Sequence, residues 1–261
     1  MNLIINNPSH AEIFTILFQH MKAFTEHVNV MFESERMYIQ ALDNARISIF
    51  EVVFPANWFE EYNHTENTTI GVNSNILYKI LSAREKTQKI SLVYDNEKND
   101  KLAIHFTSES KTEFDKHFEM SLMDIDSEIM DIPEMEYEAE FTLGSSNFAN
   151  IINQLRMFGD TLDIDCSEEK IMLCSHSQEQ GKMFVEIDID DLSSFAIIEN
   201  EKINLAYSLA QMHNICLYNK VAKEVEIKIK RDSPLKIIYN FQDNEEAKFI
   251  FYLAPKMNDD E

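Results

Sequence analysis

Four segments of the chain repeat apolar residues every three or four positions, the spacing that predicts an amphipathic helix. They cover residues 10–24, 73–84, 145–159 and 204–217. Ser9 and Glu12 have the spacing of a capping box at the start of the first segment. Gly159 ends the third segment, where a glycine commonly closes a helix. The buried face predicted for the second segment consists of Ile76, Leu77, Ile80 and Leu81.

The intervening segments are rich in β-branched and aromatic residues, several of them in period-two alternation, which predicts strands. The clearest cover residues 46–54, 89–95, 101–106, 182–190, 224–230, 234–241 and 247–253. Because several strands follow each helix at similar spacing, we predict an α+β fold. A βαβββ-type module would occur four times, paired into two similar domains. The alternative is an ordinary α+β protein whose spacing is accidental.

An acidic strip, EMSLMDIDSEIMDIPEMEY (119–137), lies at the midpoint of the chain. A solvated linker needs few Met and Ile side chains, and a core segment does not accept Asp124, Asp126, Glu128 and Asp131. We therefore expect an extended connection whose apolar side chains lie on a sheet surface and whose carboxylates face water. The predicted parts are an N-terminal domain (1–120), a connecting loop (121–137) and a C-terminal domain with an acidic tail (138–261).

Composition limits the classes of function. The formal net charge of −23 disfavours non-specific binding to nucleic acid or to an anionic membrane. No apolar run approaches the roughly 18–20 residues of a membrane span, and the N-terminus lacks the features of a signal peptide. The three cysteines are odd in number and have no CxxC spacing, which is typical of a reducing compartment. These features predict an intracellular protein, neither secreted nor bound to a membrane.

Catalysis is a rival interpretation that the carboxylates raise. Asp188, Asp190 and Asp191, or Asp163 and Asp165, could be ligands of a metal-dependent enzyme, since Mg²⁺ prefers oxygen ligands. In a strand, however, Asp188 and Asp190 would share one face while isoleucines fill the other, as in any half-buried strand. The eight histidines have no HxxxH or HxH spacing, and no glycine-rich loop or nucleophile–base pair is evident. We expect no enzymatic activity, no metal and no cofactor.

Five stretches carry a resemblance to a known family: MYIQALDNARISIFEV (37–52), GVNSNILYKIL (71–81), SLMDIDSEIMDIPEMEY (121–137), FANIINQLRMFGD (148–160) and FYLAPKMNDDE (251–261). In this order they resemble the DNA sliding clamps of the proliferating cell nuclear antigen family, with the connecting loop and the tail nearly verbatim. The resemblance covers the chain, apart from small insertions near 95–118. It implies the DNA clamp fold and a homotrimeric ring of six domains.

The resemblance also implies a function in the nucleus or at another site of DNA replication. A ring that encircles duplex DNA, whatever its sequence, would act as a processivity factor for DNA polymerase. Short peptide motifs would tether polymerase, flap nuclease and ligase in replication and DNA repair, and a clamp loader would open the ring. A topological link needs little phosphate affinity, so it is compatible with the acidic composition. The basic residues expected to face DNA are Lys22, Lys79, Arg84, Arg156, Lys220 and Lys223.

The resemblance places the partner-peptide pocket beneath the connecting loop. The matching residues are Leu42, Arg46, Ile47, Ile49, Met130, Ile132, Pro133, Pro234, Tyr252, Leu253, Ala254 and Pro255. The backbone of 253–256 would bond the extended part of the peptide. Without the resemblance, Leu42, Ile47 and Leu253 would be interpreted as the edge of a core. Met130 suits a surface that accepts several partners, because methionine is flexible and polarizable.

Ring closure in the family pairs edge strands of neighbouring subunits. Here these strands would cover about 114–120 and 181–187, with Phe118, Met183 and Val185 as the apolar contacts of the subunit interface. Segment 95–120 matches the family poorly, so the geometry of the trimer rests on the least similar part of the chain.

Some positions depart from the family pattern. Lumen positions that are usually basic correspond here to Ile16, Ser82, Asn150, Asn153 and Met157. Arg46 stands where many members have His, and Glu168 stands where eukaryotic members carry the lysine that ubiquitin modifies. Two rival functions stay open: a processivity factor of the same fold that does not encircle DNA and acts as a monomer or dimer, and a protein-interaction scaffold without a DNA role.

Overall fold

The computed structural model describes residues 1–63, 66–95, 100–110, 112–241 and 244–256. It divides into two compact units. Unit 1 contains residues 1–44, 51–130 and 244–248, and unit 2 contains residues 45–50, 131–243 and those from 249 onward. The expected acidic tail at 257–261 and part of the poorly matching stretch, 96–99 and residue 111, lie outside the described residues.

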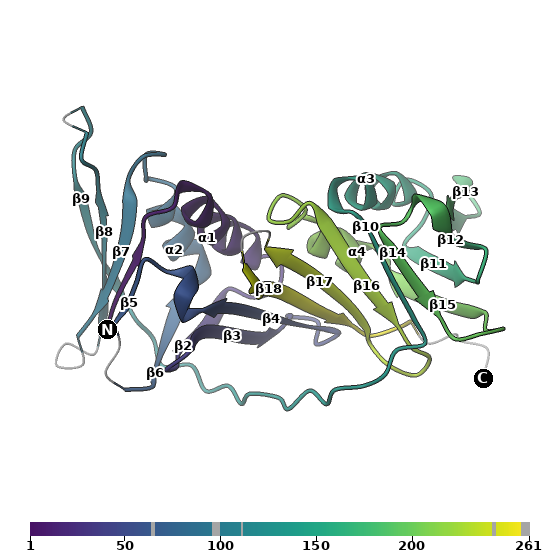
Figure 1. The fold of residues 1–261 in the computed structure, drawn as a ribbon, viewed down its shortest axis with the longest axis horizontal. Helices are drawn as coiled ribbons and strands as arrows, with labels where there is room; N and C mark the ends of the chain where they lie inside the picture. The colour runs from purple at the N-terminus through teal and green to yellow at the C-terminus, as the bar shows by residue number, and fades with distance from the viewer. Residues whose placement is uncertain (64–65, 96–99, 111, 242–243, 257–261) are drawn as a thin grey trace. The chain divides into compact units, whose positions relative to one another are not determined.

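Unit 1 contains two helices and most of the first nine strands (Figure 1). In chain order these elements are β1 (Asn2–Ile5), α1 (Pro8–Met21), β2 (His27–Phe32), β3 (Arg36–Leu42), β4 (Ser48–Pro55), β5 (Glu61–Asn63), β6 (Thr68–Asn73), α2 (Ser74–Leu81), β7 (Lys89–Tyr94), β8 (Lys101–Thr107) and β9 (Lys116–Ser121). Strand β4 contributes its first three residues to unit 2.

Unit 2 repeats this order of elements. It contains β10 (Ala139–Gly144), α3 (Ser145–Leu155), β11 (Thr161–Cys166), β12 (Lys170–Ser177), β13 (Gly181–Asp188), β14 (Ser194–Ile197), β15 (Ile203–Ser208), α4 (Leu209–Cys216), β16 (Glu224–Ile229), β17 (Leu235–Phe241) and the apolar end of β18 (Asn244–Leu253), whose residues 244–248 belong to unit 1. Apart from the short strands β5 and β14, each unit runs βαβββ twice. The predicted α+β fold with four such modules is confirmed.

The sheet order interlocks the two modules of each unit. In unit 1, β1 joins the strands of the second module in the order β5-β1-β7-β8-β9, and β6 joins those of the first in the order β4-β3-β2-β6. In unit 2, the orders are β14-β10-β16-β17-β18 and β13-β12-β11-β15. Each module therefore lends its first strand to the sheet of the other, so one module does not form a complete sheet alone.

Local sequence explains where the helices begin and end, and it corrects three expectations. The side chain of Asn7 caps α1 by accepting from the backbone N–H groups of Ser9 and His10, so the predicted Ser9–Glu12 capping box is wrong. Helix α3 ends four residues before Gly159. That glycine is needed because a Cβ there would lie 2.5 Å from the carbonyl oxygen of His176. In α2 the side chain of Ile76 is exposed, not buried.

The strands bury alternate residues, as the period-two pattern predicts. Strand β13 ends at Asp188, however, and residues Ile189–Asp191 form a 3-10 turn. The expectation that Asp188 and Asp190 share one strand face is therefore wrong. Among the described residues, no helix is long and apolar enough to cross a membrane.

Candidate functional site

An apolar patch lies on the face of the β17–β18 sheet that is turned away from the helices of unit 2. The helix-facing side is identified by its contacts with α4 and the turn after it. The ring of Tyr218 packs edge-on against Phe249 and tilted against Phe251, and the hydroxyl of Tyr239 donates to the carbonyl oxygen of Ile215 at 3.4 Å. Since side chains alternate along a strand, the intervening residues of β17 and β18 lie on the opposite face.

On that outer face, Ile238, Ile250 and Tyr252 are only 7–8% exposed. Ile49 from β4 and Ile132 from the connecting segment pack against them. When one face of an antiparallel sheet packs on a core, the opposite face normally presents polar residues to water. Here five apolar side chains gather instead, three of them buried and two, Ile49 and Ile132, partly buried against them. We call these five residues the outer patch.

Positive charge borders the outer patch. The ammonium of Lys236 lies 5.5 Å from the ring centroid of Tyr252, within cation–π distance. Arg46 is exposed and has φ +59°, a backbone conformation that costs a non-glycine residue about 1 kcal/mol or more. The Lys236 ammonium would favour a partner that carries an acidic residue beside its apolar anchors.

Three residues of the predicted pocket lie together in the structure, and one residue points to the opposite face of the sheet. Ile49, Ile132 and Tyr252 meet in the outer patch. Leu253 is fully buried on the helix-facing side, so its side chain belongs to the core and its placement in the pocket is wrong. The remaining predicted residues of unit 2 are exposed or half-buried: Arg46, Ile47, Pro133, Pro234, Ala254 and Pro255.

Sequence reasoning missed Ile238 and Ile250. The signal was present, because PLKIIYNF and AKFIFYL place apolar residues on both faces of strands whose second face should be polar. Two backbone N–H groups of the predicted peptide-bonding run are already used within unit 2. Ala254 donates to the carbonyl oxygen of Ile47 at 3.0 Å, and Lys256 donates to that of Ala206 at 2.7 Å.

In unit 1, amide side chains hold the first part of the connecting segment. The amide of Gln40 donates to the carbonyl oxygen of Met130 at 2.9 Å and accepts from its N–H at 2.7 Å. The amide of Asn29 donates to the carbonyl oxygen of Ile125 at 3.0 Å. Two strand side chains thus replace backbone pairing for a segment that is not itself a strand. The predicted pocket residue Leu42 is exposed at the end of β3.

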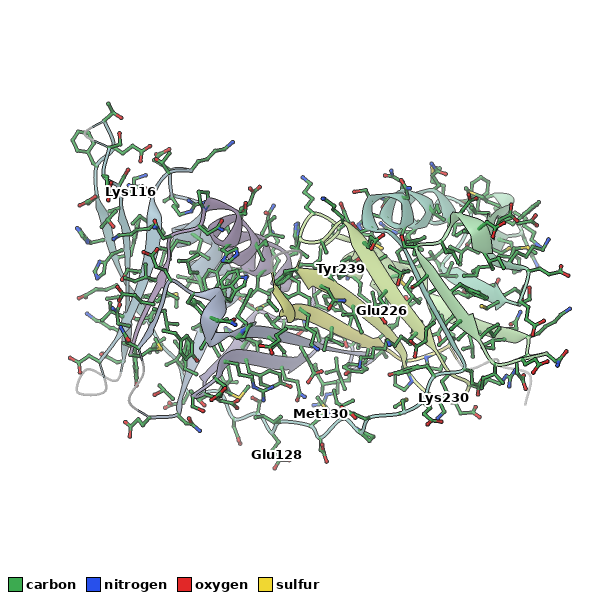
Figure 2. The ribbon with its side chains drawn as sticks, in the orientation of Figure 1. Lys116, Glu128, Met130, Glu226, Lys230 and Tyr239 are labelled. Atoms are coloured by element: carbon green, nitrogen blue, oxygen red, sulfur yellow. The ribbon has the colours of Figure 1, made fainter. Side chains whose placement is uncertain are left out.

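The carboxylates of this segment are exposed, as the side chain of Glu128 in Figure 2 illustrates. Its apolar residues are divided. Ile125 and Met130 are half-buried, whereas Met123 and Ile129 are 39% and 57% exposed. The expectation that all of its Met and Ile side chains lie on the sheet is therefore wrong for two of them. Gly71 permits the close approach, because a Cβ there would lie 2.1 Å from the carbonyl oxygen of Met123.

The helices of each unit carry exposed basic residues near their C-terminal ends. These are Lys22 and Lys79 on α1 and α2, Arg156 at the end of α3, and Lys220 and Lys223 after α4. Helices α1 and α2 pack together in unit 1, and α3 and α4 pack together in unit 2. Five uncharged residues stand at positions that the resemblance makes usually basic. Of these, Ser82, Asn150, Asn153 and Met157 are exposed, but Ile16 is only 8% exposed. Ile16 is a core residue and not the surface position predicted.

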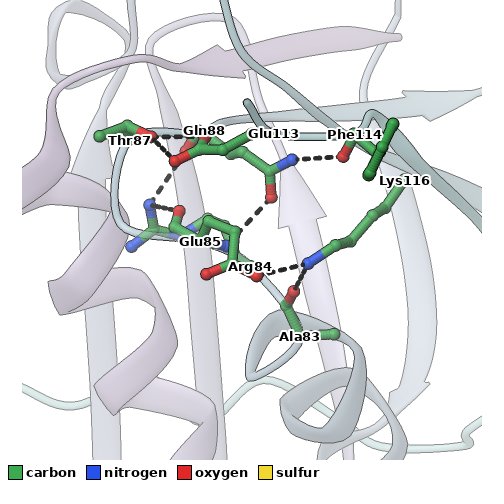
Figure 3. Close-up of polar contacts among 8 residues, drawn as sticks. All are labelled: Ala83, Arg84, Glu85, Thr87, Gln88, Glu113, Phe114 and Lys116. Carbon is green, nitrogen blue, oxygen red and sulfur yellow. Dashed lines mark hydrogen bonds and ion pairs between the residues drawn. The ribbon is translucent and has the colours of Figure 1, made fainter. Parts of the chain in front are cut away.

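Arg84 has a structural role that the sequence did not indicate. Its guanidinium donates to the carbonyl oxygens of Glu85, Lys86 and Gln88 at 2.9–3.0 Å. Figure 3 shows Arg84 beside Glu85 and Gln88. Burial lowers the pKa of this half-buried group. All three bonds come from Nη1, so this nitrogen shapes the turn after α2 and is not available to contact phosphate.

The same turn positions strand β9, the last strand in its sheet order. The buried side chain of Gln88 donates to the carbonyl oxygen of Phe114 at 2.8 Å, and the ammonium of Lys116 contacts Ala83 and Glu85 (Figure 3). Strand β13 is likewise the outermost strand of its sheet. The sequence analysis expected edge strands in these two places, with Phe118, Met183 and Val185 as contacts. All three are half-buried.

Comparison with known proteins agrees with this geometry over nearly the whole chain. Residues 6–129 match the family model "Proliferating cell nuclear antigen, N-terminal domain", and residues 131–257 match the corresponding C-terminal domain. A protein named "Proliferating cell nuclear antigen" from Chaetomium thermophilum is 27% identical over 255 residues, covering 96% of this chain and 97% of that protein. The two family models together span most of the chain and meet in the connecting segment. The chain therefore belongs to the proliferating cell nuclear antigen family.

Proposed function

We propose that this protein is a DNA sliding clamp that acts without catalysis or a cofactor. Three copies would close into a ring around duplex DNA, be opened by an ATP-driven loader, and hold DNA polymerase, flap nuclease and ligase through short peptide motifs. It would work in the nucleus or at another site of DNA replication. The observation that carries the proposal is the outer patch, where Ile132 of the connecting segment packs on apolar residues of a sheet face that would otherwise be polar.

Family membership supports this role, and the charge distribution fits it. A net charge of −23 with exposed basic residues near the helix ends suits a protein linked to DNA by its topology, because many phosphate contacts would slow sliding. Since Arg84 is engaged within its own turn, DNA contact in unit 1 would depend on Lys22 and Lys79. In unit 2 it would depend on Arg156, Lys220 and Lys223.

Ring closure would pair β9 of one copy with β13 of the next. Both strands lie at the edge of their sheets and offer backbone groups for another strand. Beside the expected contacts, the structure adds two exposed aromatic side chains at these edges. Phe114, just before β9, is 85% exposed, and Phe184 on β13 is 61% exposed. Burying such aromatic surface between copies would supply a driving force for assembly.

Peptide binding tests the outer patch. The ligand is a labelled peptide that forms a short helix with aromatic and aliphatic anchors, titrated by fluorescence anisotropy. Tyr252→Ala and Ile132→Ala should each weaken binding about 10- to 150-fold, because each removes an apolar contact of about 1.5–3 kcal/mol. Ile198→Ala is the control, since Ile198 is an exposed apolar residue of unit 2 outside the patch. Equal affinity of parent and both patch variants would place the peptide elsewhere.

Light scattering coupled to size exclusion tests the ring. A mass of three chains that persists on dilution supports it, and Phe184→Asp should reduce that mass because it places a charge in the contact. Ile198→Asp is the matched control. A single-chain mass for the parent at micromolar concentration would refute a ring that is stable off DNA, and would favour the non-encircling processivity factor.

A further inference from the structure

Three side chains that commonly bind metals meet on the outer face of the β11–β12 hairpin in unit 2. Asp163 on β11 lies directly opposite Cys174 on β12 in the antiparallel register. His176 follows Cys174 by two residues and therefore projects from the same face of β12. The alternate residues Leu162, Ile164 and Leu173 are buried on the other face.

The ligand atoms of this group are close to one another. One carboxylate oxygen of Asp163, Sγ of Cys174 and a ring nitrogen of His176 all lie within 4.8 Å. Nδ1 of His176 is 3.7 Å from Oδ2 of Asp163. Bonds of about 2.0–2.3 Å to a tetrahedral zinc ion place its ligand atoms roughly 3.5 Å apart. Small rotations of exposed side chains would close the remaining gap, since His176 is exposed and only Cys174 is buried.

The charged side chains around these three residues favour a metal ion that exchanges with solvent. Lys182 and Lys256 lie near the Asp163 carboxylate, and Lys182 also faces the Cys174 thiol. The ammonium of Lys256 is held by the hydroxyl of Thr161 at 2.6 Å. Lys182, opposite His176 on β13, is therefore the cation that would compete with a metal. Asp165, also near the group, bonds to the Asn204 amide at 2.6 Å.

We propose that Asp163, Cys174 and His176 form a zinc site with a fourth position left for water or a partner's side chain. Oxygen, sulfur and nitrogen together suit Zn²⁺ better than Mg²⁺ or Ca²⁺, which prefer oxygen alone. The proposal revises the expectation of no metal. For histidine, that expectation rested only on the spacing between one histidine and another. Cys174 and His176 are separated by one residue, and in a strand this spacing places both side chains on the same face. The zinc site does not depend on the proposed clamp function.

The site joins two paired strands one position in from the edge strand β13, so bound metal would stabilise this sheet against heating.

Calorimetry with Zn²⁺ on the full chain tests the proposal, and Co²⁺ is the spectroscopic probe because thiolate ligation gives a charge-transfer band. One ion per chain with that band is expected. His176→Ala and Cys174→Ser should each weaken binding at least about tenfold and abolish or weaken the band. Lys182→Gln should strengthen binding. Circular dichroism confirms that each variant is folded, and His176 is exposed, so its variant should fold normally.

The control is His117→Ala. His117 and His105 form the imidazole pair on β8 and β9, with Nδ1 atoms 2.8 Å apart, and this pair could bind the metal instead. Loss of binding in His117→Ala but not in His176→Ala would overturn the proposal in favour of the pair. The absence of binding by the parent, or equal binding in all variants, would also overturn it.

Discussion

The contact between Gln40 and Met130 allows a sharp test of how the connecting segment is held. The side chain of Gln40 is 8% exposed and makes two hydrogen bonds to the backbone of Met130, at 2.7 and 2.9 Å. Gln40→Met keeps a similar shape but removes both bonds. At about 0.5–1.5 kcal/mol per bond, the segment should lose about 1–3 kcal/mol of local stability. The amide of Met130 should then exchange with solvent about 5- to 150-fold faster.

Hydrogen exchange followed by NMR measures this change at one amide. Asn29→Ala is the matched control, because Asn29 holds the same segment at Ile125 and Ser127. It should leave the exchange of Met130 nearly unchanged, and Gln40→Met should spare the amides of β3 and β4. If Met130 exchanges equally fast in the parent and in Gln40→Met, the two hydrogen bonds do not hold the segment, and a different contact must.

Three further predictions follow from buried or coupled groups. Gln88→Ala leaves the carbonyl of Phe114 without its partner, so the assembly through β9 should weaken by about 1–3 kcal/mol, seen as a lower mass on dilution. Leu253→Ala should cost about 2–5 kcal/mol in urea unfolding, because Leu253 is fully buried; an effect under 1 kcal/mol would contradict its core placement. Burial, and then the charge of Arg156, lower the pKa of His213, so the unfolded state binds its proton first and stability falls as pH drops below about 6.5. Arg156→Gln should raise that pKa in an NMR titration and reduce the loss; an unchanged pKa would contradict the coupling.

The helices and most strands are predictable because their signal is local. Apolar periodicity located the four helices of the described residues, but residues 204–208 of the fourth predicted segment belong to strand β15. β-branched alternation located β7, β8, β16 and β17 within a residue or two. Helix ends were less predictable, since several side chains near an end compete for the first N–H groups. Ser9 and Asn7 could each cap α1, and the presence of Pro8 at the first helical position selects Asn7.

The candidate sites were predictable only in part. The resemblance placed Ile49, Ile132 and Tyr252 correctly together, but it did not tell which face Leu253 occupies. Adjacent residues of a strand point to opposite faces, so an error of one position exchanges core for surface. The structural role of Arg84 in the turn was not predictable. Its side chain donates to backbone carbonyl oxygens, which every residue type supplies.

By itself, the sequence determined the fold class, the fourfold repeat of modules and the acidic connection between two domains, because these depend on periodicity, propensity and charge along the chain. Only the tertiary structure decided which modules exchange their first strands, and which side chains from distant strands meet. Ile238 and Ile132 in the outer patch, and Asp163 and His176 on one hairpin face, are brought together by register and sheet order. Register follows from how whole faces pack, and no local pattern contains that information.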